Sequence, residues 1–210
     1  MYIPKEFRHE NKEEQLAFIA AHPFGLLLCN GSIVPETTHL PFTSEQFGDK
    51  FLLHSHLSIA NPQARLLKNG ERVKVVFAGP HAYISPELYE KAQNVPTWNY
   101  AAVHITGTCR VLPETEAATK LLEKTIENFE PAWQEKFKAL DQTYFTSLLK
   151  GILAFTIEAE TIEAKLKISQ NKTHNEQHRI TESLLHSSDP AAKELGETMQ
   201  KYYSKRSSES

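Results

Sequence analysis

Polar side chains that could hold a small ligand gather in four short stretches of this sequence, each next to an apolar segment. The stretches cover residues 37–42, 54–62, 79–86 with 95–100, and 167–171. The second one leads from an apolar run into Asn61-Pro62, a pair typical of the N-cap and first position of a helix. Because unpaired backbone N–H groups at a helix start favour anions, this stretch predicts a phosphate site.

Aromatic residues in the third stretch point to a planar ligand. Trp98 and Tyr100 offer flat faces to a ring, while Thr97, Asn99 and Lys167 offer hydrogen-bond donors. The same aromatic residues are equally typical of a core or a dimer interface, because aromatic side chains dominate packing in both. Lys167 could reach a phosphate as a point charge or could lie in water at the surface. Both interpretations stay open.

Histidines raise the question of a metal. His54 and His56 are two positions apart, so a strand would place both imidazoles on one face, as a metal site requires. Candidate third ligands are His39, His81 and His104. The sequence shows no carboxylate or cysteine that would clearly complete a metal site with this pair. We therefore predict that the two histidines are hydrogen-bonded or solvated and bind no metal. An axial haem ligand at His54 or His56 has less support still.

Two further function classes find little support in the residues. Ser85 and Ser169 lack an identifiable base and orienting acid, which argues against a hydrolase. The formal net charge of −3 and the pI near 6.4 argue against a broad basic face for nucleic acid. DNA binding would therefore need a local patch, and the sequence shows no defensible helix-turn-helix signature.

Strands follow one another along the chain, with helices between and after them. We expect strands at 24–29, 32–34, 51–54, 73–77, 100–112 and 153–157, and helices at 11–22, 61–69, 114–128, 140–150, 176–185 and 191–202. Asn30-Gly31 predicts a two-residue type I′ turn, and Gly107 predicts a bulge or bend. Because strands and helices do not alternate regularly, an antiparallel sheet or barrel flanked by helices is favoured.

Five motifs occur in a specific order along nearly the whole chain. They are residues 38–42, His56 with 60–62, Phe77 with 79–86, 95–100 with 103–104, and Lys167 with 169–171. In these motifs the sequence resembles the PaiB family, FMN-binding negative transcriptional regulators with a flavin split-barrel fold. It departs from the family at Ile59, where arginine is common, and at Leu88, where tryptophan is common. Without that arginine a possible phosphate ligand is missing.

The resemblance implies an α+β protein with an antiparallel six-stranded split β-barrel and flanking helices. It implies an FMN-binding domain over residues 1–172, a helical extension over 173–203 and a flexible tail over 204–210. A homodimer would hold FMN at the subunit interface. By analogy, the cofactor-binding residues would be Thr37, Thr38, His39, His56, Ser58, Asn61, Thr97, Trp98, Asn99, Lys167, Gln170 and Asn171. No catalytic residue is assigned.

The implied function is negative regulation of transcription by a flavoprotein homodimer, with DNA or another regulatory protein as a further partner. One alternative is an FMN-dependent oxidoreductase of the split-barrel superfamily, and another is a flavin-binding scaffold without catalysis. Cys29 and Cys109 lie in apolar runs, where free cysteine behaves as a small buried hydrophobe. With no signal-peptide pattern and no membrane-spanning apolar run, we expect a cytoplasmic protein.

Overall fold

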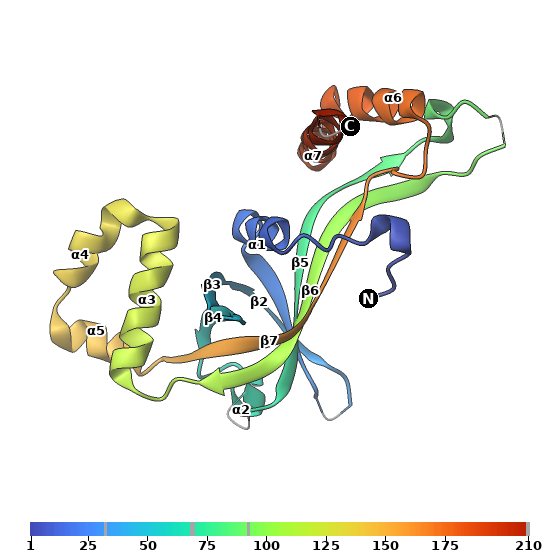
Figure 1. Ribbon diagram of the computed structural model, residues 1–210. Coiled ribbons are helices and arrows are strands. Elements are labelled where there is room, and N and C mark those ends of the chain that lie inside the picture. Colours follow the sequence, from blue (N-terminus) through green and yellow to red (C-terminus); the bar gives the residue numbers. More distant parts are fainter. Residues whose placement is uncertain (32, 68–69, 92, 209–210) are drawn as a thin grey trace. The chain divides into compact units, whose positions relative to one another are not determined.

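The computed structural model describes residues 1–31, 33–67, 70–91 and 93–208, which contain a seven-stranded sheet (Figure 1). The strand order is β2-β1-β5-β6-β7-β4-β3. The strands are β1 Phe24–Cys29, β2 Glu36–Pro41, β3 Thr43–Phe47, β4 Lys50–Ser58, β5 Arg72–Ile84, β6 Thr97–Val111 and β7 Ile152–Lys167. The pairings of β1 with β2 and β5, and of β4 with β3 and β7, are all antiparallel. The predicted α+β class is confirmed, with seven strands in place of six.

Helices precede, interrupt and follow the strands. The α-helices are α1 Lys12–Ala21, α2 Gln63–Leu67, α3 Thr115–Phe129, α4 Gln134–Lys138, α5 Gln142–Leu149, α6 His174–Leu185 and α7 Pro190–Ser208. Short 3₁₀ helices are η1 Lys5–Phe7, η2 Pro86–Leu88 and η3 Pro131–Trp133. The sequence did not predict α4 or η3. Helix α7 continues past the expected end at Tyr202 into the segment expected to be a tail.

The chain divides into two compact units. The terminal unit consists of Met1–Asn11, Ala78–Val103 and Ala164–Ser210, and the central unit consists of Lys12–Phe77 and His104–Glu163. Strands β5, β6 and β7 contribute residues to both units, whereas β1 to β4 belong to the central unit alone. Each unit has its own core.

Phenylalanine rings fill the core of the central unit. Phe42 packs edge-on against Phe77 and Phe155, with ring centroids 5.6 Å and 6.4 Å apart. Edge-to-face pairs of this kind add about 0.5–1.5 kcal/mol to the burial of the rings. Buried and half-buried residues alternate along β4, so Leu53 and Leu57 enter this core while His54 and His56 face the other way.

The helical segment between β6 and β7 has a small core of its own. Figure 1 shows α3, α4 and α5 together in yellow and light orange. Ala118 and Leu121 of α3 are buried with Phe145 and Leu149 of α5, in a cluster that also includes Ala154 of β7. Since α3 has a strongly one-sided distribution of apolar residues, its polar face is left for solvent and for ion pairs.

The predicted hairpin after α1 forms, but its turn is longer than expected. Cys29 pairs with Glu36, so residues 30–35 make the connection and the two-residue turn at Asn30-Gly31 is wrong. Ile33 and Val34 are exposed and belong to no strand, and Ser32 lies outside the described residues. In the observed register all six residues of β2 pair with β1, and Leu40 of β2 is buried.

Strand β7 is three times as long as the predicted strand because charged residues extend it. Beyond the predicted end at Ile157 the strand carries Glu158, which pairs with a cation on the adjacent strand β4, and Glu160, which pairs with a cation on β5, beyond β6. Lys50 lies 2.7 Å from the Glu158 carboxylate, and Arg72 lies 2.7 Å from that of Glu160. Cross-strand pairs of opposite charge stabilise a sheet, although apolar alternation is lost.

In the terminal unit, α6 and α7 lie side by side and cover the ends of β5 and β7. Ile168 is fully buried against Ile180 of α6 and against Leu195 and Met199 of α7. A Cβ at Gly196 would lie 2.8 Å from the Leu185 nitrogen, so this glycine allows the two helices to approach closely. Among the described residues, no helix combines the length and the apolar character needed to cross a bilayer.

Candidate ligand-binding site

In the central unit, β2 and the turn after β4 are joined by a side-chain hydrogen bond. The Asn61 Nδ2 donates to the Thr38 Oγ1 at 3.0 Å, and the Asn61 Oδ1 accepts from the Gln63 backbone nitrogen at 2.9 Å. Asn61 therefore caps α2 in the manner the sequence predicted. Two predicted site residues that are 23 positions apart are thus brought into contact.

The three predicted residues of β2 point to two faces of the strand. Side chains alternate along a strand, so Thr38 lies with the buried Leu40 while Thr37 and His39 are exposed on the opposite face. The His39 ring stacks on Phe24, with centroids 5.8 Å apart. A ligand on one face therefore meets Thr37 and His39, and a ligand on the other meets Thr38 with Asn61.

His56 and Ser58 share a face at the end of β4. They pair in register with Ala154 and Ile152 of β7. Burial lowers the pKa of His56, which favours a neutral imidazole near pH 7. The exposed Ser58 hydroxyl accepts from the Ala60 nitrogen at 3.2 Å.

A buried glutamine that the sequence did not single out fixes this region. Gln63 is 1% exposed, and its Nε2 donates to the carbonyl oxygens of Leu27 at 3.2 Å and Glu36 at 2.9 Å. It ties the first turn of α2 to both strands of the hairpin. No local pattern signals such a contact, because its acceptors lie 36 and 27 residues away.

In the terminal unit, Lys167 at the end of β7 is bonded to the start of β6. Its Nζ donates to the Thr97 hydroxyl and, at 2.7 Å, to the Trp98 carbonyl oxygen. Burial, with a smaller contribution from Lys165, lowers the pKa of this ammonium group. The structure brings the predicted residues Thr97 and Lys167 together, and Lys167 is not the solvated surface lysine of the alternative interpretation.

Asn99 and Gln170 shape the loop that follows β7. Asn99 is fully buried, and its Nδ2 donates to the Ser169 Oγ at 2.8 Å. Ser169 has a φ of 67°, a left-handed conformation that is uncommon for a residue with a side chain. The Gln170 Oε1 accepts from the Ile168 nitrogen at 2.8 Å, whereas Asn171 is exposed.

The Trp98 ring borders an open hollow of about 310 Å³ in the terminal unit. Small residues at positions 78, 79, 101 and 102 form part of its lining, and the rings of His81, Trp98 and Tyr100 complete it. Trp98 is 54% exposed, so the interpretation of this residue as part of the core is wrong. Small residues beside aromatic rings leave space for a planar group to stack, which fits the flavin ring of FMN.

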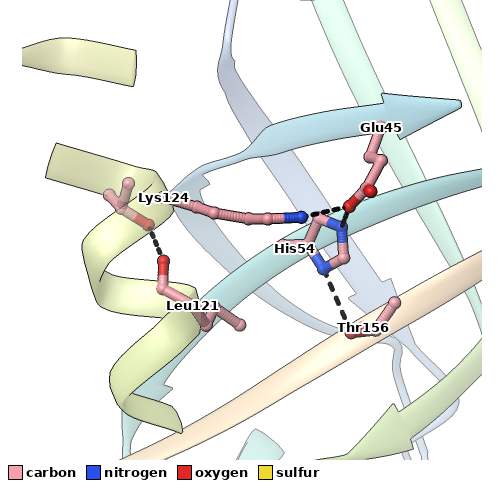
Figure 2. A network of polar contacts seen from close by, with 6 residues as sticks. Glu45, His54, Leu121, Lys124 and Thr156 are labelled. Carbon is pink, nitrogen blue, oxygen red and sulfur yellow. Dashed lines mark hydrogen bonds and ion pairs between the residues drawn. The ribbon is translucent and has the colours of Figure 1, made fainter. Parts of the chain in front are cut away.

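Another polar cluster, unrecognised in the sequence, surrounds His54, which lies on the same face of β4 as His56 (Figure 2). The Glu45 carboxylate of β3 accepts from Lys124 of α3, and its Oε2 lies 3.2 Å from the His54 Nε2. The His54 Nδ1 lies 3.2 Å from the Thr156 Oγ1 on β7. The sequence could not reveal this cluster, because β3 itself was not predicted.

The environment of His54 keeps its ring neutral. Burial and the Lys124 charge lower its pKa, while the Glu45 carboxylate raises it to a smaller extent. The predicted hydrogen-bonded state of this histidine is confirmed. In the part of the chain that the structure describes, no group of three His, Cys, Asp or Glu side chains is arranged to hold a metal ion.

Comparison with known proteins identifies the family. The sequence model described as "Putative FMN-binding domain" matches residues 1–161. The chain belongs to this family. It is also 38% identical over 204 residues to protease synthase and sporulation protein PAI 2 of Bacillus subtilis, a match that covers 95% of this chain and 97% of that protein. The resemblance to PaiB proteins and the prediction of FMN as cofactor are thereby confirmed.

Solved structures similar to this member of the FMN-binding family establish its fold. The flavocytochrome Anf3 from Azotobacter vinelandii has a TM-score of 0.63 and 14% identity, and the match covers 79% of this chain and 72% of Anf3. The FAD and heme binding protein from Mycobacterium smegmatis has a TM-score of 0.63 and 17% identity, over 81% of this chain and 78% of that protein. The predicted flavin split-barrel fold is confirmed.

Proposed function

We propose that this FMN-binding protein is a homodimeric regulator that represses transcription. The observation that carries the proposal is the match to PAI 2 over 95% of the chain, which includes the residues around the Trp98 hollow. A regulator needs a ligand that changes its state. FMN suits this role because it binds through a ring and a phosphate and, when bound, supplies a flavin that can be reduced and reoxidised.

The flavin ring would stack on Trp98, in the hollow whose lining includes Gly79 and Tyr100. Residues of the terminal unit proposed to hold the cofactor are Thr97, Trp98, Asn99, Lys167, Gln170 and Asn171. Lys167 and Thr97 would orient Trp98, since Lys167 bonds both the Thr97 hydroxyl and the Trp98 carbonyl. Their contribution to FMN binding is then partly indirect.

The phosphate and ribityl chain would be held by the polar residues of the central unit. These are Thr37, Thr38, His39, His56, Ser58 and Asn61, which supply hydroxyl, amide and imidazole groups. Helix α2 begins there, but it is only five residues long, so most of the binding would come from these side chains. In the proposed homodimer, FMN would lie at the subunit interface.

A titration tests the cofactor and the dimer together. The purified chain is titrated with FMN while quenching of flavin fluorescence is followed, and its mass in solution is measured by light scattering. We expect saturable micromolar binding and twice the 23.9 kDa mass of the chain. A monomer that leaves flavin fluorescence unchanged would rule out the proposed site.

Repression is tested by electrophoretic mobility shift at several salt concentrations. With a net charge of −3, nonspecific attachment to DNA should be weak, so a sequence-specific shift would support direct operator binding. If no DNA sequence is preferred, the regulator must act through a protein partner. Rapid oxidation of NADH or NADPH by the FMN-loaded protein would instead favour the oxidoreductase.

A further inference from the structure

A second hollow of about 310 Å³ lies within the central unit, where α3 and α5 meet the ends of β6 and β7. Apolar residues make up most of its lining. Ala118, Leu149, Leu153 and Ala154 belong to the buried core beneath it. Its volume is at the lower end of the range for small-molecule sites, which points to a compact ligand.

Among the described residues that line the hollow, one, Lys150, carries a charge. Lys150 is the C-cap residue of α5, and its backbone nitrogen donates to the Thr146 carbonyl at 3.3 Å. Its side chain is exposed and, among the described residues, has no ion-pair or hydrogen-bond partner. Thr146 and Thr115 also line the hollow and add hydroxyl groups to its lining. The polar part of the lining thus favours an anion.

The start of α3 also borders the hollow. Glu114, the N-cap residue, makes no side-chain capping bond, and Thr115 is the first residue of the helix. The positive end of a fifteen-residue helix therefore lies at the edge of the hollow. The carboxylates of Glu114 and Glu116 at this helix start oppose its positive end, so the proposed head-group site rests on Lys150.

An exposed isoleucine lies at the edge of the hollow. Ile59 is 52% exposed. Its backbone nitrogen donates to the carbonyl oxygen of Gly151 at 3.0 Å, and this hydrogen bond holds Ile59 next to the residue that follows Lys150. Ile59 lines the same hollow. A molecule that covered this side chain while its head met the lysine would bury apolar surface and pair a charge at once.

We propose that this hollow binds a small carboxylate with an apolar body, with its head group on Lys150 and its body over Ile59 and the Ala118 floor. None of the residues proposed for FMN lines this hollow. The site therefore adds a second ligand to the proposed function, one that would report on the supply of a small organic acid.

Octanoate serves as the probe, and isothermal titration calorimetry of the full chain gives the readout. We expect one saturable site for octanoate and no binding of octylamine, which has the same body and the opposite charge. Equal binding of the two, or no saturation by octanoate, would overturn the proposal. FMN added to the octanoate-saturated protein should bind as it does without octanoate. Displacement of one by the other would show that octanoate occupies the flavin site.

Matched variants locate the site. Lys150→Gln should weaken octanoate binding at least tenfold, whereas Lys136→Gln, at an exposed lysine of α4 outside the lining, should leave it unchanged. Ile59→Ser, at an exposed position that should not affect folding, should weaken it about fivefold. Equal affinities in Lys150→Gln and Lys136→Gln would remove the assignment of the head group. The octanoate titration does not require FMN. A negative result would therefore overturn the octanoate site and leave the proposed FMN-binding function untouched.

Discussion

Gly107 on β6 lies so close to Glu158 on β7 that no side chain fits between them. A Cβ at position 107 would be 2.2 Å from the Glu158 carbonyl oxygen and 2.9 Å from its carbonyl carbon. The sequence suggested a bulge or bend at this glycine, but β6 runs through it without a break. The residue is therefore required by the close approach of two neighbouring strands of the sheet.

Gly107→Ala should destabilise the protein by about 3 kcal/mol, because the clash is with backbone that can move only if the sheet distorts. Urea unfolding at neutral pH measures the loss. The control is Gly151→Ala, where the nearest atom to a new Cβ is the Leu148 carbonyl oxygen at 3.3 Å. If both substitutions lower the free energy of unfolding by the same amount, the close approach of β6 and β7 does not explain why position 107 is a glycine.

Lys124→Met should raise the pKa of His54. The Lys124 charge lowers this pKa, and without it the Glu45 carboxylate acts on His54 alone. Titration of the imidazole signals by NMR gives the value directly. Lys120→Met is the matched control, since Lys120 lies on the same helix but pairs with Glu116 at 2.7 Å. An unchanged His54 titration in Lys124→Met would mean that Lys124 does not contact Glu45 in solution.

Stability should fall as the pH drops through the range in which histidine titrates. Burial lowers the pKa values of His54 and His56 below the usual 6.5, so the unfolded chain takes up protons before the folded chain does. Their contribution is complete above 6.5 and is lost as the pH falls through the lower folded values. The melting temperature should decline from about pH 7.5 to pH 5.5, and less steeply in His56→Gln. The same slope in both proteins would be inconsistent with a neutral, buried His56.

Glu176 should contribute to stability through its charge. Its pKa lies below 4.5 because the backbone N–H groups of Glu90 and Thr173 donate to its carboxylate. A carboxylate with a lowered pKa stabilises the fold above the unfolded value, and this contribution is lost as the pH falls through the folded value. Glu176→Gln should cost about 1–2 kcal/mol at pH 7 and less near pH 4.

Urea unfolding of Glu176→Gln at the two pH values measures this difference. The exposed Glu197 of α7 provides the control substitution, Glu197→Gln, which should change stability little at either pH. A cost for Glu176→Gln that did not shrink in acid would show that the shape of the side chain matters and not its charge.

Trp98→Leu should weaken FMN binding about tenfold, because stacking of a ring on an aromatic side chain contributes about 0.5–1.5 kcal/mol beyond burial. Quenching of flavin fluorescence measures the affinity and should also become smaller. The chain has one other tryptophan, Trp133, in the helical segment between β6 and β7. Trp133→Leu should leave FMN affinity unchanged, and equal affinity in both variants would remove Trp98 from the site.

Local sequence patterns predicted the helices whose ends or faces are set by residues close together in the chain. The Asn61-Pro62 pair marked the start of α2, and apolar spacing marked α3 and α6. The outer half of β7 was missed, because cross-strand charges such as the 2.7 Å pair of Lys50 with Glu158 extend it. Strand β3 was missed because its residues are mostly polar, and its pairing with β4 fixes it.

The sequence by itself determined the family and the cofactor, because ordered motifs can be read along the chain, and it proposed candidate site residues from their side-chain types. Only the tertiary structure decided which of those residues meet. It placed Asn61 on Thr38 and Lys167 on Thr97, and it put Thr37 and Thr38 on opposite faces. Contacts between residues far apart in sequence depend on strand register and helix packing, and a linear pattern does not encode them in any local signal.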